Sequence, residues 1–237
     1  MKIENAVAVV TGANRGIGKA LVDALVSRGA ARVYAAARDP KALEARDRVI
    51  PVQLDVTIPE QVAAVAKRAG DVTMLFNNAG LLGAFNLLAT PQRELEKDFD
   101  TNFYGSLAVT KAVLPALERA AGRAAIVNVL TVVSLASMPA LGGYSASKAA
   151  AFSMTQALRA ELGKKGIAVH AVFPGPVDTD MSRSITLPKT SPEVVARAIL
   201  DGVERGDEDI CPDPMSREVF AKWSNAPKDV ERQFGSM

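Results

Sequence analysis

The chain is poor in the side chains that build disulfide frameworks and metal sites. It has one cysteine, Cys211, and one histidine, His170, among its 237 residues. One thiol cannot form an internal disulfide, so the fold does not depend on an oxidising compartment. Neither residue belongs to a cluster with metal-ligand spacing or to a Ser-His-Asp pattern. We therefore expect an inert thiol at Cys211, a structural histidine and no metal.

The chain also lacks a large excess of either charge and lacks long apolar runs. The formal net charge is +2, and no five consecutive residues carry the same charge, which argues against nucleic acid or an anionic membrane as partner. The most apolar long window, 124–143, is broken by polar residues and Pro139, so it does not predict a membrane span. The N-terminal apolar run 6–10 is too short for a signal peptide. We expect a cytoplasmic protein.

Apolar runs that alternate with helical patterns are what the chain does have. The composition, 49% hydrophobic and 23% charged, is typical of a soluble globular protein. The runs predict buried strands at 6–10, 32–37, 48–56, 72–80, 124–130 and 167–173, with a short seventh at 208–213. The helical patterns cover 19–29, 59–70, 92–121, 144–162 and 191–206.

This order predicts an α/β fold: a Rossmann-type, doubly wound parallel sheet of about seven strands with helices on both faces. We expect one domain over 1–237, in which 185–237 forms a less typical lid and tail. Pro115 should bend or interrupt the helix 92–121. The segment 214–237 looks like a polar tail, docked by Phe220 and Trp223.

A glycine-rich turn follows the first predicted strand and opens the first helix. It reads TGANRGIG over 11–18, with Gly12, Gly16 and Gly18 spaced G-x-x-x-G-x-G. Glycines let the chain approach a phosphate closely, and a helix N-terminus offers free N–H groups and a positive dipole end. The spacing alone is weak evidence, and a turn without a ligand is the alternative. The strand–turn–helix context favours a dinucleotide site.

The end of the second strand predicts which dinucleotide is preferred. A carboxylate there would accept bonds from the 2′-hydroxyl of NAD, but this chain has Ala37 followed by Arg38. Arg15, inside the glycine turn, adds a second guanidinium suited to a 2′-phosphate. Asp39 is the counter-evidence, because it could face the ribose. We favour NADP(H) and leave NAD(H) possible.

A phenol and an ammonium stand four positions apart in GGYSASKAAAF, residues 142–152. Tyr144 and Lys148 therefore share one face of a helix. Lowering a phenol pKa from 10 by about three units takes roughly 4 kcal/mol, and a neighbouring ammonium and a nicotinamide cation both favour phenolate. This pattern predicts an acid–base pair; an ordinary helix is the alternative.

Taken together, these motifs resemble those of the short-chain dehydrogenase/reductase family, in its NADP-preferring subgroup. The resemblance covers residues 6–181, and its motifs occur in the family's order. They are Thr11-Gly12-x-x-x-Gly16-x-Gly18, Asp55-Val56, Asn77-Asn78-Ala79-Gly80, Asn102, Tyr144-x-x-x-Lys148 and Pro174-Gly175-x-Val177-x-Thr179.

The resemblance implies four catalytic residues. Tyr144 would give a proton to the substrate oxygen, and Lys148 would hold the nicotinamide ribose. Asn102 would hold a water that links Lys148 to solvent. Thr131 stands where the family usually has the serine that polarises the carbonyl, and Ser134 is a possible substitute.

The resemblance also implies the cofactor contacts. Asp55 would accept a hydrogen bond from the adenine amino group, with Val56 packed beside it. Asn78 would lie beside the adenosine ribose. Val177 and Thr179 would contact the nicotinamide amide. The full expected set is Gly12, Asn14, Arg15, Gly16, Ile17, Gly18, Arg38, Asp55, Val56, Asn78, Ala79, Gly80, Tyr144, Lys148, Pro174, Gly175, Val177 and Thr179.

The expected pocket walls, 80–90, 131–141 and the segment after Pro174, are apolar. We therefore expect a small-molecule carbonyl or alcohol substrate: a hydrophobic ketone, aldehyde or acyl compound. The short lid 180–190 would also admit a 3-oxoacyl thioester. A non-catalytic NADP(H)-sensing or scaffold protein is the alternative, which the unusual Thr131 favours. The helices 92–121 and 144–162 have apolar faces that suit a homodimer or homotetramer.

Overall fold

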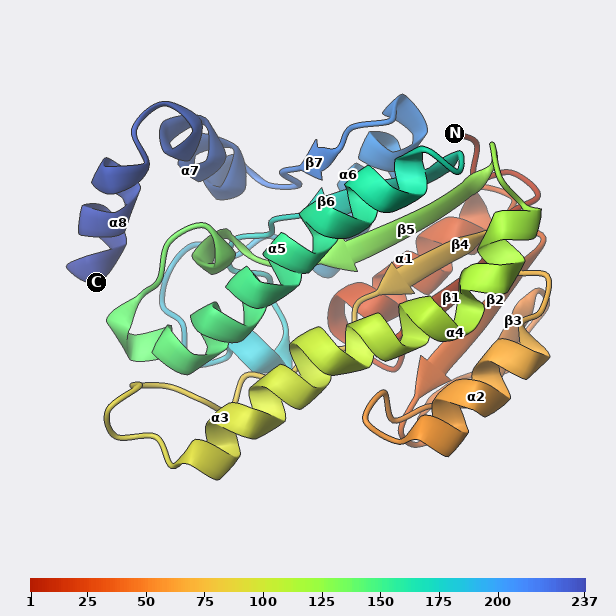
Figure 1. Ribbon diagram of the computed structural model, residues 1–237, viewed down its shortest axis with the longest axis horizontal. Coiled ribbons are helices and arrows are strands. Elements are labelled where there is room, and N and C mark those ends of the chain that lie inside the picture. Colours follow the sequence, from red (N-terminus) through yellow and green to blue (C-terminus); the bar gives the residue numbers. More distant parts are fainter.

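Seven parallel strands form one sheet, in the order β3-β2-β1-β4-β5-β6-β7, in the computed structural model, which describes residues 1–237 (Figure 1). The predicted α/β class and parallel sheet are thus confirmed. The order reverses between β1 and β4, which is where such sheets bind ligands. The strands are β1 (Val7–Thr11), β2 (Arg32–Ala37), β3 (Val49–Gln53), β4 (Met74–Asn77), β5 (Ala124–Val129), β6 (Ile167–Val172) and β7 (Asp209–Ile210).

Helices cover both faces of the sheet, as Figure 1 shows. The helices α1 (Gly16–Ser27) and α6 (Pro192–Arg205) lie on one face, and α2 (Pro59–Arg68), α4 (Ser106–Arg119) and α5 (Gly142–Gly163) on the other. Alternate strand residues serve the two cores, because successive side chains point to opposite faces. Val10 and Phe76 belong to the α1–α6 core, whereas Val9 and Leu75 belong to the other.

The long helical region is interrupted, but not at the proline. The helix α3 (Gln92–Phe99) runs through a π-helical turn, Asp100–Gly105, into α4. Pro115 lies inside α4 and is exposed, so its missing N–H leaves a carbonyl that faces water. The expected interruption at Pro115 is therefore wrong. The π turn instead surrounds Asn102, and such turns are frequent at functional sites.

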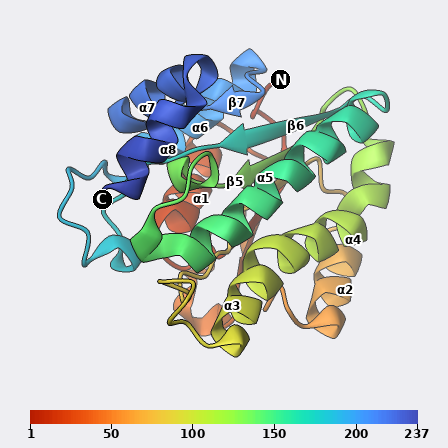
Figure 2. The ribbon, with the colours of Figure 1, turned by 60° about the vertical axis from the view of Figure 1, so that its left-hand side comes forward.

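The C-terminal segment is a pair of helices rather than a polar tail. Asp213 accepts the Ser216 N–H at 2.8 Å and caps α7 (Pro214–Asn225), which α8 (Pro227–Gly235) follows. Phe220 and Trp223 pack, as expected, in an aromatic cluster with Phe152 and Phe173. Figure 2 shows α7 and α8 at the β7 end of the molecule.

None of the helices combines the length and the apolar character needed to cross a bilayer. The single domain over 1–237 and the cytoplasmic location stay predictions.

Candidate active site

A cleft of about 810 Å³ opens at the carboxyl ends of β1, β4, β5 and β6. Its wall takes in the glycine turn, the ends of these strands, the first turns of α5 and the segment after β6. All but two of the predicted site residues line it. The exceptions, Gly18 and Asn102, are buried behind the wall.

The backbone of the glycine turn packs so closely that side chains would not fit at Gly12 or Gly18. Gly12 and Gly16 have positive φ angles of 64° and 53°. A Cβ at Gly12 would lie 2.9 Å from the Ala79 Cα, and one at Gly18 would lie 2.1 Å from the Gly12 carbonyl oxygen. The Asn78 amide donates to the Thr11 and Gly12 carbonyls at 2.9 and 3.1 Å. This rigid turn at the N-terminus of α1 fits a pyrophosphate.

The corner beyond β2 presents cations and no free carboxylate. Ala37 ends the strand and Arg38, which is exposed, lines the cleft. Asp39 does not line the cleft, and its Oδ1 accepts the Lys41 N–H at 2.9 Å and caps the next turn. Arg15 pairs with Asp180 at 3.2 Å, but both side chains are at least half exposed, so a phosphate could displace Asp180. The corner thus fits a 2′-phosphate.

Tyr144 and Lys148 lie buried on the same face of α5. Lys148 Nζ donates to the Val129 carbonyl at 2.9 Å and lies 6.0 Å from the centre of the Tyr144 ring. Burial lowers the pKa of Lys148 to about 8. Burial also raises the pKa of Tyr144, and the charge of Asp98 raises it further.

Burial thus opposes the lowering of the Tyr144 pKa that we expect from Lys148 and a nicotinamide cation, and that lowering stays a prediction. Burial removes the phenolate from water, which favours the protonated phenol. At neutral pH Tyr144 is protonated, which is the form that can donate a proton to a carbonyl oxygen.

Thr131, rather than Ser134, offers a hydroxyl to the cleft. Thr131 follows β5 and lines the cleft, and its Oγ1 accepts only a long bond, 3.4 Å, from the Val133 N–H. The Ser134 hydroxyl is buried and donates to the Thr131 carbonyl. The geometry favours Thr131 over Ser134 as the hydroxyl that faces a substrate, and the catalytic role of Thr131 stays a prediction.

Asn102 holds the chain that follows β4. Its Oδ1 accepts the Leu81 N–H, and its Nδ2 donates to the Leu81 carbonyl and the Ser147 hydroxyl, all at 2.9 Å. A Cβ at Gly80 would lie 3.3 Å from Asn102 Oδ1 and 3.5 Å from Lys148 Nζ. Gly80 thus lies between the amide and the ammonium. The water-holding role of Asn102 stays a prediction.

The remaining predicted contacts are positioned by local hydrogen bonds. Asp55 Oδ1 accepts from the backbone and the hydroxyl of Thr57, at 3.0 and 2.7 Å. Thr179 caps the short turn Asp180–Ser182, and its Cγ2 would lie 2.9 Å from a Cβ at Gly16. This contact sets the start of the lid against the glycine turn.

Sequence reasoning missed several residues that shape the site. Asp98 is fully buried beside the catalytic pair, and the only signal for it was its place four residues before Asn102, on the same helix face. Asp213 Oδ2 accepts the Gly175 N–H at 2.9 Å and ties α7 to the segment after β6. Met215 and Met237 line the cleft, and nothing in the polar character of their segment indicated it.

Fold and site together define a dinucleotide-binding α/β protein with a Tyr-Lys pair. The family model of short chain dehydrogenases matches residues 6–190. The chain belongs to this family of oxidoreductases, which confirms the resemblance seen in the sequence.

Three known proteins show how close the likeness is. The chain is 34% identical over 194 residues to the 3-oxoacyl-acyl-carrier-protein reductase FabG of Vibrio cholerae, covering 78% of this chain and 79% of that protein. It is 35% identical over 184 residues to a 3-alpha-(or 20-beta)-hydroxysteroid dehydrogenase of Mycobacterium bovis, covering 74% and 70%. A short chain dehydrogenase from Burkholderia cenocepacia, solved in complex with NADP, has a TM-score of 0.94 and 38% identity, and 99% of each chain is covered.

Proposed function

We propose that the protein is an NADP(H)-dependent oxidoreductase that transfers a hydride between the nicotinamide and a carbonyl or secondary alcohol. One observation carries the proposal: Tyr144, Lys148 and Thr131 line the same cleft as the glycine turn. A protein that only senses the cofactor needs the turn but not the acid–base pair. The sensing or scaffold alternative therefore accounts for less of the site.

The cofactor proposed is NADP(H), for which the site provides a phosphate cradle and two guanidiniums. Gly12, Gly16 and Gly18 would surround the pyrophosphate, and Arg15 and Arg38 would bind the 2′-phosphate. The solved Burkholderia cenocepacia relative, which binds NADP, supports this preference. Nothing in the corner prevents a 2′-hydroxyl from binding, so NAD(H) is the weaker alternative.

The bound nicotinamide supplies or accepts the hydride at the carbonyl carbon. Tyr144 donates its phenolic proton to the carbonyl oxygen, and the Thr131 hydroxyl hydrogen-bonds the same oxygen. Lys148, which donates to the Val129 carbonyl, would hold the ribose of the bound cofactor. Asn102 and Gly80 keep the chain after β4 close to Lys148, where a water could pass the proton to solvent.

A hydrophobic ketone, aldehyde or acyl compound is the substrate class that suits the cleft. The part of the cleft away from the glycine turn, where we place the substrate, is lined by apolar side chains. They come from the segment after β4, the loop before α5, the lid and α7: Leu81, Leu82, Met138, Leu141, Ile185, Leu187 and Met215. Methionine side chains adapt to irregular or bulky ligands. Of the expected wall 80–90, only the first three residues line the cleft.

A 3-oxoacyl thioester is the second candidate substrate. It is supported by the Vibrio cholerae relative, which reduces a 3-oxoacyl group on acyl-carrier protein. The hydroxysteroid dehydrogenase relative supports a rigid polycyclic ketone to the same degree. The homodimer or homotetramer expected from the sequence stays a prediction.

Loss of NADPH absorbance with a panel of carbonyl compounds tests the function. The panel holds a bulky aryl ketone, a ketosteroid, a 3-oxoacyl thioester and a small polar ketone, each with NADPH and with NADH. We expect NADPH-dependent turnover that is highest with an apolar substrate. Tight NADPH binding with no turnover on any carbonyl would contradict the enzyme proposal and favour the sensor.

A further inference from the structure

Asp98 is a buried carboxylate that the proposed mechanism does not use. It is the one fully buried residue of α3, and none of its surface is exposed. Burying a carboxylate is costly unless hydrogen bonds and charges compensate. Asp98 does not line the cleft, so a role in substrate contact does not account for it.

The Asp98 carboxylate anchors the loop that joins β4 to α3. Oδ1 accepts the Gly83 N–H at 2.9 Å, and Oδ2 accepts the Ala84 N–H at 3.1 Å. A Cβ at Gly83 would lie 3.2 Å from Oδ1, so the glycine lets the loop backbone come this close. Both carboxylate oxygens are thus committed to two successive backbone amides.

The anchored loop in turn caps the helix that carries Tyr144. The Phe85 carbonyl accepts the Gly143 N–H at 3.1 Å, and the Ala84 carbonyl accepts the Tyr144 N–H at 3.0 Å. These N–H groups belong to the first turn of α5 and have no partner within the helix. No side chain caps α5, so the two loop carbonyls take the place of a cap.

Close packing holds this contact in one arrangement. A Cβ at Gly143 would lie 2.5 Å from the Ala84 Cβ and 2.5 Å from the Leu95 Cδ2. Leu95 is one turn before Asp98 on α3. Figure 2 shows α3 beside the start of α5, with the loop next to both.

We propose that Asp98 is a positioning residue for the reaction: its carboxylate fixes residues 83–85, and these fix the first turn of α5 and the phenol it carries. The inference rests on the proposed function for the reaction it serves. The anchoring itself rests on the hydrogen bonds.

The charges around Asp98 agree with this role. Burial raises the pKa of Asp98, and Glu94 raises it a little more, whereas the two amide bonds and Lys148 lower it. The Asp98 charge raises the pKa of both Tyr144 and Lys148. Asp98 therefore favours the protonated phenol as well as holding its helix turn.

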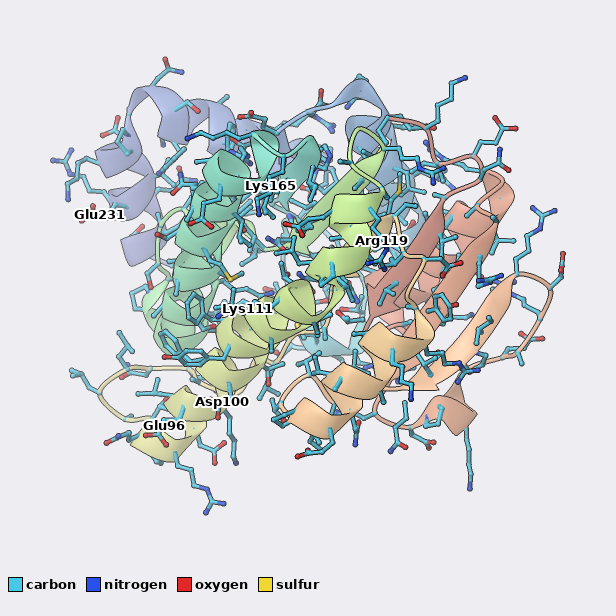
Figure 3. All side chains as sticks on the ribbon, turned by 45° about the vertical axis from the view of Figure 1, so that its right-hand side comes forward. Glu96, Asp100, Lys111, Arg119, Lys165 and Glu231 are labelled. Carbon is cyan, nitrogen blue, oxygen red and sulfur yellow. The ribbon has the colours of Figure 1, made fainter.

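The test compares Asp98→Asn with Glu96→Gln. Asparagine keeps the shape but offers one acceptor and one N–H₂ group to two backbone donors. Glu96 lies exposed on the outer side of the same helix (Figure 3) and bonds only Gln92, so its variant removes an equal charge without touching the loop. Asp98→Glu, which restores the charge, is the rescue variant.

We expect Asp98→Asn to lower kcat at least tenfold with little change in NADPH affinity, and to move the alkaline limit of carbonyl reduction to lower pH. Amide exchange should quicken in 81–86 and 142–148. Glu96→Gln should match the unchanged protein, and Asp98→Glu should recover part of kcat and pH profile. Unchanged exchange, kcat and pH profile in Asp98→Asn would overturn the inference.

Two further readouts keep the outcomes separable. If the unchanged protein reduces no carbonyl, the proposed function fails, while amide exchange still decides whether Asp98 anchors the turn. If Asp98→Asn does not fold, Gly83→Ala presses a methyl group against the carboxylate and keeps the charge. It should quicken the same exchange, and no change there would contradict the anchoring.

Discussion

Lys148 is a cation held almost out of water, with 5% of its surface exposed and one protein hydrogen bond. Its pKa is lowered from 10.5 to about 8, so folding favours the uncharged amine. The stability linked to this shift is present above the unfolded pKa and is lost as the pH falls through 8. A shift of this size corresponds to about 3 kcal/mol.

Lys148→Met should therefore gain stability relative to the unchanged protein as the pH falls. We expect the difference in unfolding free energy between the two proteins to move by up to about 3 kcal/mol in favour of the variant from pH 10 to pH 7. The variant also loses the bond to the Val129 carbonyl, so the change of the difference with pH, and not its absolute value, reports the burial. Urea unfolding of both proteins without cofactor at pH 7, 8, 9 and 10 measures this difference in unfolding free energy. A difference that does not vary with pH would contradict the claim that burial lowers the pKa of Lys148.

Arg15 and Arg38 should decide between the two nicotinamide dinucleotides. Each charge-assisted bond to a phosphate contributes about 1.5 kcal/mol or more, so Arg15→Ala and Arg38→Ala should each weaken NADPH binding about tenfold. NADH, which lacks the 2′-phosphate, should bind nearly as before.

Fluorescence titration with both cofactors measures this, with the exposed Arg232→Ala of α8 as control. An equal loss for NADPH and NADH would show that the two arginines do not read the phosphate.

The site residues that could be predicted from the sequence are those that belong to a motif of fixed spacing. The glycine turn and the Tyr144–Lys148 spacing predicted a site, and in the structure Gly12, Gly16, Tyr144 and Lys148 line the same cleft. Asp98 and the competition between Thr131 and Ser134 could not be resolved, because both depend on which backbone groups come within hydrogen-bond distance. The raised pKa of Tyr144 could not be predicted, because its main cause is burial, which the sequence does not reveal.

Among the elements, strands were easier to predict than helix ends. A buried parallel strand is a near-continuous apolar run, so all seven could be found. The π turn at Asp100–Gly105 has no such signal, and the Asn102 bonds to Leu81 and Ser147 made within it join segments far apart in the sequence. The helices α7 and α8 were missed because few apolar residues, among them Val230 and Phe234, dock them.

Phe234→Ala should show that α8 is an integral part of the fold. Phe234 is fully buried in the cluster that joins α5, β6 and the C-terminal helices. Removing a buried phenyl ring costs about 3 to 5 kcal/mol. Urea unfolding should show this loss, whereas the exposed Met237→Ala should cost less than about 0.5 kcal/mol. A loss below 1 kcal/mol for Phe234→Ala would mean that α8 packs loosely.

At the scale of the whole molecule, the parallel sheet brings the carboxyl ends of all its strands to one edge. Segments as far apart as the glycine turn, Thr131 and Val177 therefore meet in one cleft. The sequence order of strands and helices was enough to predict this gathering, since ligands bind at that edge of a doubly wound sheet. The shape of the part of the cleft where we place the substrate was not predictable, because it depends on where α7 and the lid pack.

The central claim, that Tyr144 is the proton donor in a hydride transfer, is tested most directly by Tyr144→Phe. The measurement is single-turnover oxidation of bound NADPH by a carbonyl substrate found in the panel, for the variant and the unchanged protein. We expect NADPH to bind both with similar affinity, and the rate to fall by about 10² to 10⁴ in the variant. Equal rates in the two proteins would contradict the account.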